Sequence, residues 1–338
     1  MIWNLLIIAG ATALASTLFV SLARTQLLRH DILDRPNNRS SHAHPTPRGG
    51  GLGVLAALIP AWVIVQFVMP TTGGMTAAFW LVPLAALVLA AVSLVDDLVT
   101  LGPLPRLATQ FAAALAGAFV IDGPVFQGLL PGPLDLMAVA IGWVWFVNLF
   151  NFLDGIDGIS GVEAISIGLG LVIIGALGGV STMDASHGHA LAVAAAASGF
   201  LVWNWPPAKI FLGDSGSVPL GYLLGWLLLS LAADGAWQAA IILPLYYLAD
   251  STITLFRRII RGEKFWLAHR DHFYQAAIKR GMSHARVSSI IAVLNLALVA
   301  LALVSVIGGE GSTWSWAALG SALVIVVLLL WWLAKPRV

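Results

Sequence analysis

Apolar stretches of membrane-spanning length recur along the whole chain and restrict it to an integral membrane fold. A helix needs about 20 consecutive apolar residues to cross the hydrocarbon core of a bilayer. Hydrophobic residues make up 59% of the chain and charged residues only 10%, whereas a typical soluble domain has about 25% charged residues. Spanning helices are expected at about residues 2–22, 49–69, 78–95, 104–122, 134–150, 159–180, 188–204, 215–233, 236–256, 287–308 and 314–334. The sequence therefore predicts an all-α, multi-pass membrane protein of about eleven transmembrane helices, forming one domain over residues 1–338.

The basic residues predict how this protein lies in the membrane. The chain has 17 lysines and arginines, and all of them fall in alternate loops, in the helix ends beside those loops or in the C-terminal tail. The loops are 23–48, 96–103, 151–158, 205–214 and 257–286. Because basic loops stay in the cytoplasm, we expect the N-terminus outside and the C-terminus in the cytoplasm. The first span has Arg24 and Arg29 after it and no basic stretch before it, which argues against a cleaved signal peptide.

Most of the paired carboxylates, asparagines and histidines also lie in these basic loops, so an active site is expected on the cytoplasmic face. The chain has no cysteine, which excludes disulfides and thiolate metal sites. In loop 23–48, His42, His44 and Arg48 are candidates for holding phosphate oxygens; contact with anionic lipid headgroups is the alternative. The glycines at 49–51 allow the backbone to approach a ligand or a neighbouring helix closely.

Two adjacent acids, Asp96 and Asp97, follow the third span. Acids at a membrane boundary are costly and are functional candidates by default. Neighbouring carboxylates raise one another's pKa, which suits a general base, or they bind a divalent cation. The alternative is a solvated helix C-terminus, which the helix dipole makes unfavourable for acids.

The fifth span ends in a run of oxygen-bearing side chains. Asn148 and Asn151 are three residues apart and share a helix face, which Asp154 continues before the turn at Asp157. So many polar groups beside a bilayer are hard to bury without a metal ion or a polar ligand. A polar turn at the interface is the alternative.

The seventh span leads through Trp203 and Trp205, which are typical of an interfacial aromatic belt, to Phe211 and Asp214. Phe211 is also suited to packing on a neighbouring helix. Asp214 precedes the eighth span, where an acid caps helix amides or holds Mg²⁺.

Loop 257–286 contains two charged groups. The arginines at 257, 258 and 261 are orientation signals. The stretch His269-Arg270-Asp271-His272 suits a diphosphate, because arginine forks onto phosphate oxygens; a zinc site needs more ligands at defined spacing. Asp250, two helical turns before Arg257, is expected to pair with that arginine.

Taken together, these motifs resemble the polyprenyl-phosphate N-acetylhexosamine-1-phosphate transferase superfamily, and most of all its bacterial branch that initiates O-antigen or capsule synthesis. The resemblance rests on five stretches that occur in the family's order and cover nearly the whole chain, namely residues 45–51, 96–97, 148–158, 211–216 and 269–272. It implies that undecaprenyl phosphate attacks the β-phosphate of a UDP-sugar, giving undecaprenyl-diphosphate-sugar and UMP. The implied donors are UDP-N-acetylhexosamines and their 6-deoxy relatives. The implied location is the bacterial inner membrane.

The resemblance also implies residue roles. Mg²⁺, or Mn²⁺ in its place, would be held by Asp214, with Asn151 as second ligand and Asp154 as a nearby candidate. Asp96 or Asp97 would act as a base toward the lipid phosphate or orient it. Both a direct displacement and a covalent aspartyl intermediate remain open.

The remaining implied residues contact the donor. The uridine pocket would be lined by Asp157, Asn204 and Phe211, with Phe211 stacking on uracil. The diphosphate or the sugar would be contacted by His269, Arg270 and His272, and phosphate would be contacted by Lys209 and Arg48. The expected partners are thus a UDP-sugar, undecaprenyl phosphate and the lipid bilayer, with a homodimer left open and no nucleic acid.

This chain differs from the motifs of other members of the superfamily in two places. The phospho-MurNAc-pentapeptide translocases of peptidoglycan synthesis have three histidines in the last loop, where this chain has His-Arg-Asp-His; they remain the alternative within the superfamily. The pair Asp96-Asp97 is not continued by a third aspartate. An ion-coupled transporter, the alternative of another class, is disfavoured because its binding groups would lie at the bilayer midplane, often in repeated halves. A non-catalytic scaffold would not need Asn151 and Asp214 together.

Overall fold

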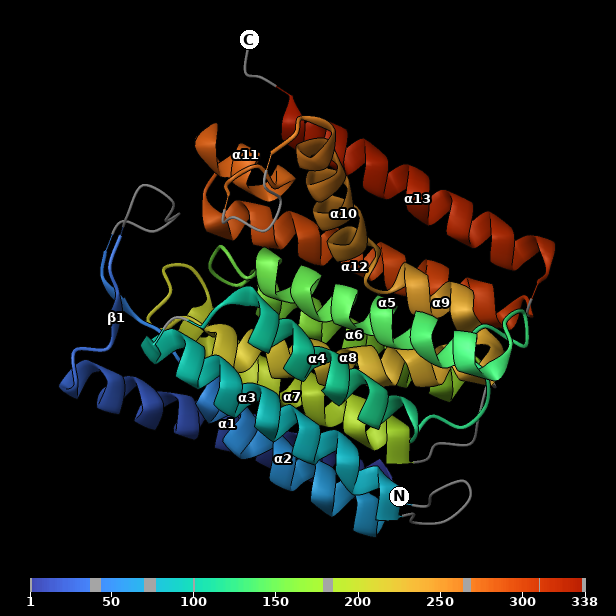
Figure 1. Cartoon of the computed structure of the whole chain (residues 1–338), viewed down its shortest axis with the longest axis horizontal. Coiled ribbons are helices and arrows are strands. Elements are labelled where there is room, and N and C mark those ends of the chain that lie inside the picture. The colour runs from blue at the N-terminus through green and yellow to red at the C-terminus, as the bar shows by residue number, and fades with distance from the viewer. Residues whose placement is uncertain are drawn as a thin grey trace.

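The computed structural model describes residues 2–36, 44–69, 77–99, 101–178, 185–263, 269–309 and 311–335. Within them the chain forms a bundle of helices that run roughly side by side, with β1 and α11 at one end (Figure 1). The helices are α1 (Ile2–Arg29), α2 (Gly50–Val68), α3 (Leu81–Val99), α4 (Pro103–Ala118), α5 (Gly132–Leu153), α6 (Ile159–Gly178), α7 (Ala185–Asn204), α8 (Asp214–Leu231), α9 (Trp237–Ile242), α10 (Leu245–Ile260), α11 (Phe273–Lys279), α12 (His284–Ile307) and α13 (Thr313–Ala334). A 3₁₀ turn covers Ala77–Trp80 and a π-helical turn covers Ala232–Ala236. The strands β1 (Leu33–Asp34) and β2 (Thr46–Pro47) pair antiparallel.

The core of the bundle is built around α8. Nearly every side chain of α8 is buried, from Ser215 to Leu231, and α3, α5 and α2 pack against it. The peripheral helix α13 instead exposes large apolar side chains such as Val327 and Leu328. A helix that is apolar both toward its neighbours and outward is typical of a bilayer environment.

Eight helical stretches of the described residues are long and apolar enough to cross a membrane. The all-α membrane fold is therefore confirmed. The predicted spans 78–95 and 104–122 correspond to α3 and α4, which fall outside these eight. The count of eleven and the orientation remain predictions.

The predicted ninth span, 236–256, is wrong as one continuous helix. The chain leaves α8 through the π-helical turn, where Gly235 has φ 93°, and continues as α9 only to Ile242. Pro244 then stands before α10, and a proline can neither donate a backbone hydrogen bond nor follow a helical turn without a clash. Figure 1 shows α10 at a steep angle to the neighbouring helices α12 and α13.

The glycines that follow loop 23–48 serve helix packing. A Cβ placed on Gly51 would lie 2.0 Å from the Cα of Gly216, so the first turns of α2 and α8 touch backbone to backbone. The first amides of α2 are satisfied by the segment before α8: the N–H of Gly50 donates to the carbonyl of Phe211 (2.8 Å) and that of Gly51 to the carbonyl of Leu212 (2.9 Å). This contact joins two chain segments that flank the polar residues at this end of the bundle.

Gly51→Ala is expected to destabilise the protein. The added methyl group meets backbone atoms that cannot rotate away, and overpacking of this kind costs about 1–3 kcal/mol. Gly10→Ala is the matched control, because a Cβ on Gly10 of α1 meets nothing within 4 Å. Thermal unfolding in detergent should show a lowered transition for Gly51→Ala only; equal transitions for the two variants would contradict the close contact.

Candidate active site

Arg48 joins two aspartates that lie far from it in the sequence. The backbone of Arg48 forms a parallel bridge with Phe211, which places its side chain beside the start of α8. There its Nη2 lies 2.5 Å from Oδ1 of Asp214 and 3.4 Å from Oδ1 of Asp97. The predicted phosphate residue, one member of the acid pair and the predicted metal ligand are thus in one cluster.

A second arginine, Arg106 at the start of α4, completes this cluster. Its Nη1 lies 2.8 Å from Oδ2 of Asp96, and its Nη2 lies 3.6 Å from Oδ2 of Asp214. We call Arg48, Asp96, Asp97, Arg106 and Asp214 the arginine–aspartate cluster. From the sequence, Arg106 is expected only as an orientation signal, although its place one short loop after the acid pair also indicates contact with those acids.

The charges of this cluster do not balance. Three carboxylates face two guanidinium groups, which leaves one net negative charge. These carboxylates lie close together and only partly in water; the side chain of Asp96, for example, is 9% exposed. Such a group favours an additional cation.

The run from Asn148 to Asp154 contacts different neighbours at each turn. Asn148 donates to Oε1 of Gln110 on α4 (2.7 Å), while Oδ1 of Asn151 accepts from the hydroxyl of Ser217 (2.5 Å). Ser217 lies one turn after Asp214 on α8, so Asn151 is fixed beside the helix start that carries Asp214. The predicted common face of the two asparagines therefore lies along the boundary between α4 and α8.

Asp154 lies just after α5, in a half-buried position. Its Oδ1 accepts a hydrogen bond from the hydroxyl of Ser160 (2.7 Å). Burial raises the pKa of Asp154 to about 6, the Ser160 hydrogen bond and the charge of Arg48 oppose this rise, and the charge of Asp214 adds to it. A bound cation would favour the charged form again.

Asp157 and Asn204 hold two loops together. Oδ1 of Asn204 accepts from the N–H of Gly158 (2.8 Å), and its Nδ2 donates to the carbonyl of Ile210 (2.9 Å). Oδ2 of Asp157 accepts from the N–H of Ala208 (3.0 Å). Both side chains are buried, so they shape the space between the loops 151–158 and 205–213, and their direct contact with uridine remains a prediction.

The two other predicted donor residues in this region differ in exposure. Phe211 is half-buried beside Arg48. Lys209 is exposed, and its Nζ lies 5.5 Å from the ring centroid of Trp203. His44 lies two residues before β2, and His42 lies outside the described residues.

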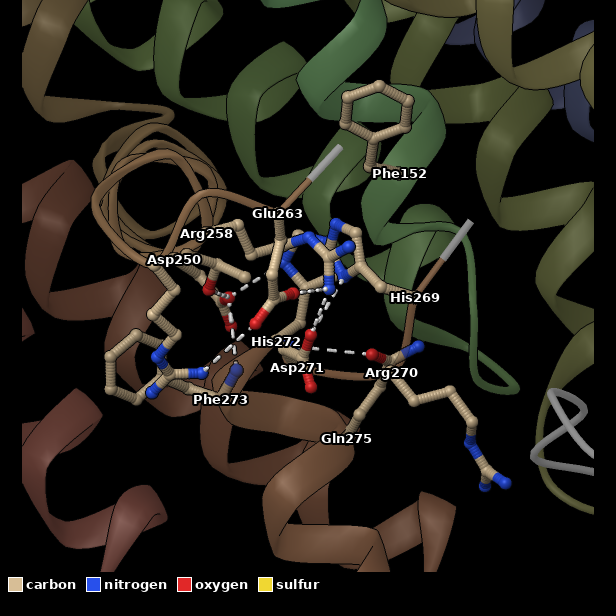
Figure 2. A network of polar contacts seen from close by, with 12 residues as sticks. Phe152, Asp250, Arg258, Glu263, His269, Arg270, Asp271, His272, Phe273 and Gln275 are labelled. Carbon is tan, nitrogen blue, oxygen red and sulfur yellow. Dashed lines mark hydrogen bonds and ion pairs between the residues drawn. The ribbon is translucent and has the colours of Figure 1, made fainter. Parts of the chain in front are cut away.

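A second polar group forms around α11, and Figure 2 shows its members from close by. Asp250 is fully buried, and its carboxylate accepts from the backbone N–H groups of Phe273 (3.1 Å) and Tyr274 (3.3 Å). Nδ1 of His272 lies 3.0 Å from the same carboxylate. The expected pairing of Asp250 with Arg257 is therefore wrong: the acid satisfies the first amides of α11, which attract negative charge, and Arg257 lies over the ring of Phe273 at 4.8 Å.

The residues of the motif His269-Arg270-Asp271-His272 contact different partners. Asp271 pairs with Arg258 at 2.5 Å, and the rings of His269 and His272 lie 4.9 Å apart. Burial lowers the pKa of His269 to about 4, and nearby His272 and Arg258 act in the same direction. His269 is therefore neutral near pH 7 and suits hydrogen bonding better than charge pairing. The side chain of Arg270 extends away from the two rings (Figure 2).

Tyr274 connects this histidine group to the loop 151–158. Its hydroxyl donates to the carbonyl of Phe152 (3.3 Å), and a Cβ on Gly155 would lie 2.0 Å from the same hydroxyl oxygen. On the other side of the loop, Nδ1 of His284 lies 3.2 Å from Oδ1 of Asp157. The loop 151–158 is thus held by side chains of α11 and α12.

The donor atoms fit Mg²⁺ rather than a softer metal. Within the described ranges, no three histidine, aspartate or glutamate side chains form a ready metal cage. Mg²⁺, however, is usually held by one or two carboxylates together with water and substrate phosphates. Asp214 of the arginine–aspartate cluster, which has excess negative charge, and the nearby side chains of Asn151 and Asp154 offer oxygen ligands for such an ion.

Known proteins are similar to this chain over most of its length. Residues 79–232 match the model of glycosyl transferase family 4. A Streptomyces coelicolor protein with a glycosyltransferase description is 30% identical over 317 residues, covering 90% of this chain and 72% of its own. The decaprenyl-phosphate N-acetylglucosaminephosphotransferase of Mycolicibacterium smegmatis is 26% identical and covers 83% of this chain and 77% of its own. The undecaprenyl-phosphate alpha-N-acetylglucosaminyl 1-phosphate transferase of Escherichia coli K12 is 26% identical, covering 85% and 80%.

Proposed function

Because the chain belongs to glycosyl transferase family 4, within the superfamily of polyprenyl-phosphate sugar-1-phosphate transferases, we propose that it transfers a sugar 1-phosphate from a UDP-sugar to undecaprenyl phosphate. The products are undecaprenyl-diphosphate-sugar and UMP. The observation that carries the proposal is the arginine–aspartate cluster, in which Arg48 and Arg106 both contact Asp214. The reaction would initiate an O-antigen or related envelope polysaccharide at the cytoplasmic face of the bacterial inner membrane.

The reaction joins two anions. An oxygen of the lipid phosphate attacks the β-phosphorus of the donor, the bond from that phosphorus to the bridging oxygen breaks, and UMP leaves with that oxygen. Phosphoryl transfer depends mainly on positioning and on stabilising charge. When bound, Mg²⁺ would be held by Asp214, Asn151 and Asp154 and would offset the charge of the phosphates.

The arginines of the cluster supply fixed positive charge for this chemistry. Arg48 and Arg106 each bridge two acids in the structure, and a guanidinium group forks onto phosphate oxygens as well as onto carboxylates. When the diphosphate is bound, both arginines can share their hydrogen bonds between the acids and the phosphate oxygens. Asp97 or Asp96 then orients the lipid phosphate or takes its proton.

The donor is proposed to be a UDP-N-acetylhexosamine or its 6-deoxy relative. Two of the similar proteins are, by their names, N-acetylglucosaminyl or N-acetylglucosamine phosphotransferases. The sequence His-Arg-Asp-His at 269–272 disfavours the muramyl-pentapeptide donor. Neutral His269 suits hydrogen bonding to sugar hydroxyl or acetamido groups.

A donor panel tests this function. Purified protein in detergent with undecaprenyl phosphate and Mg²⁺ should release UMP from a UDP-N-acetylhexosamine, with the lipid product detected by mass spectrometry. EDTA should abolish the release, and added Mg²⁺ or Mn²⁺ should restore it. Turnover of UDP-MurNAc-pentapeptide in preference to every UDP-hexosamine would refute the proposed donor, and full activity in EDTA would refute the metal.

A further inference from the structure

A buried polar pair lies inside the bundle, away from the arginine–aspartate cluster. Glu163 of α6 is 0% exposed and Asn295 of α12 is 1% exposed. Nδ2 of Asn295 donates to Oε2 of Glu163 at 2.7 Å. Both helices are long and apolar enough to span a membrane, and a buried acid in such a helix is a functional candidate whose partner must be identified.

Two buried oxygen atoms of this pair lack a hydrogen-bond donor. Oε1 of Glu163 and Oδ1 of Asn295 are both buried and have no hydrogen-bond partner among the described residues. A carboxylate can only accept, and a buried acceptor without a donor is costly. A proton on the carboxyl group would add an O–H donor and remove the charge from an apolar environment. Neutral Glu163 therefore accounts for the pair better than ionised Glu163.

The helix α12 carries other polar residues on the same side. His284, Ser288 and Asn295 are four and seven residues apart, which places them on one helix face. His284 contacts the side chain of Asp157, and the hydroxyl of Ser288 donates to its carbonyl (2.8 Å). Near the start of α12, this face therefore contacts Asp157 of the loop 151–158, and farther along the helix it contacts Glu163.

The helix α6 also carries one residue that contacts the loop 151–158 and, three residues later, Glu163. Ser160 donates to Asp154, and Glu163 follows Ser160 by three residues on the same helix face. The hydroxyl of Tyr247 also lies 3.5 Å from that of Ser160. The positions of Asp154 and Asp157 thus depend on how α6 and α12 lie against each other, and a single polar pair in an apolar helix interface can fix that register.

We propose that Glu163 is a positioning residue: as a neutral carboxylic acid paired with Asn295, it fixes the register of α6 against α12 and so places Asp154 and Asp157 for the transfer reaction. The catalytic part of this inference rests on the proposed function. The inference that Glu163 is neutral does not rest on that function, because it concerns only the hydrogen bonds between Glu163 and Asn295.

Two substitutions separate the roles of shape and charge. Glu163→Gln keeps the size and supplies an N–H donor for Oδ1 of Asn295, so kcat should stay at the wild-type level. Glu163→Leu removes both hydrogen bonds, and kcat per folded molecule should fall about 100-fold, since a displacement of about 1 Å at a reacting group has this effect. In Glu163→Leu/Asn295→Leu the unpaired amide is gone and stability should recover, while kcat stays low because nothing fixes the register.

For each variant, kcat is measured on monodisperse protein, at a temperature well below its unfolding temperature. A wild-type kcat in Glu163→Leu would reduce Glu163 to a packing residue and overturn the positioning role. A Glu163→Gln variant as inactive as Glu163→Leu would overturn the neutral pair, because the reaction would then need the carboxylate. Recovery of kcat in the double variant would overturn the register argument.

Infrared spectroscopy tests the protonation separately from catalysis. The spectrum of wild type minus that of Glu163→Gln should contain the carbonyl stretch of a protonated carboxylic acid near pH 7. Carboxylate bands in its place would overturn the neutral pair. If wild-type protein transfers no sugar phosphate from any donor, the proposed function fails, and this spectrum still decides the state of Glu163.

Discussion

Asp214→Asn should reduce transfer of the sugar phosphate about 1,000-fold, because removing one preorganised electrostatic group from a phosphoryl or acyl transfer site has effects of this size. Asp214 starts α8 and meets both arginines of the cluster, at 2.5 Å from Arg48 and 3.6 Å from Arg106. The substitution keeps the shape of the side chain and removes the proposed anionic Mg²⁺ ligand. UMP release at saturating substrates measures the effect.

The matched control for this variant is Asp122→Asn, which changes an exposed aspartate that follows α4. It should leave UMP release unchanged. Both proteins should elute as folded species and unfold at temperatures close to that of the wild type. A folded Asp214→Asn protein with wild-type activity would remove Asp214 from the site.

Arg48→Met should lower kcat about 100-fold through the loss of one charge-assisted contact to the transferred phosphate. The substitution also leaves Asp97 and Asp214 without the guanidinium group that both contact. Arg48→Lys keeps the charge but loses the planar fork, so its activity should fall between those of the wild type and Arg48→Met.

Arg35→Met serves as the control for Arg48. Arg35 also pairs with an aspartate, Asp31 at 2.8 Å, but its side chain is 65% exposed, and exposed ion pairs contribute little. Steady-state kinetics with both substrates should show a loss of kcat only for the Arg48 variants. Equal kinetics for Arg48→Met and Arg35→Met would show that Arg48 acts only as a surface charge.

Hydropathy is enough to predict the all-α membrane fold, because the length of an apolar span is a local property. The contact between Arg48 and Asp214 joins residues 166 positions apart, and no periodicity encodes such a distance. The glycines at 49–51 indicate a close approach, and the structure adds the partner, since Gly51 and Gly216 let α2 and α8 touch.

The errors have physical causes of the same kind. Hydropathy does not reveal the break at Pro244, because its value is an average over many residues and a single proline changes that average little. Asp250 was assigned to the nearest arginine in sequence, whereas the amides at the start of α11 are nearer in space. Arg106 differs from the expectation of an orientation signal alone, because an arginine can orient a chain and also contact neighbouring acids.

The proposed reaction transfers a sugar phosphate and not a sugar alone. A UDP-N-acetylhexosamine radiolabelled in its β-phosphate distinguishes the two when wild-type protein is incubated with undecaprenyl phosphate and Mg²⁺ and the lipid is extracted. We predict that the label enters the lipid fraction, that unlabelled UMP appears in equal amount, and that both are lost in Asp214→Asn. Label that stays in the aqueous phase as UDP while sugar enters the lipid would contradict the account, because the arginine–aspartate cluster would then serve a sugar transfer and not a phosphoryl transfer.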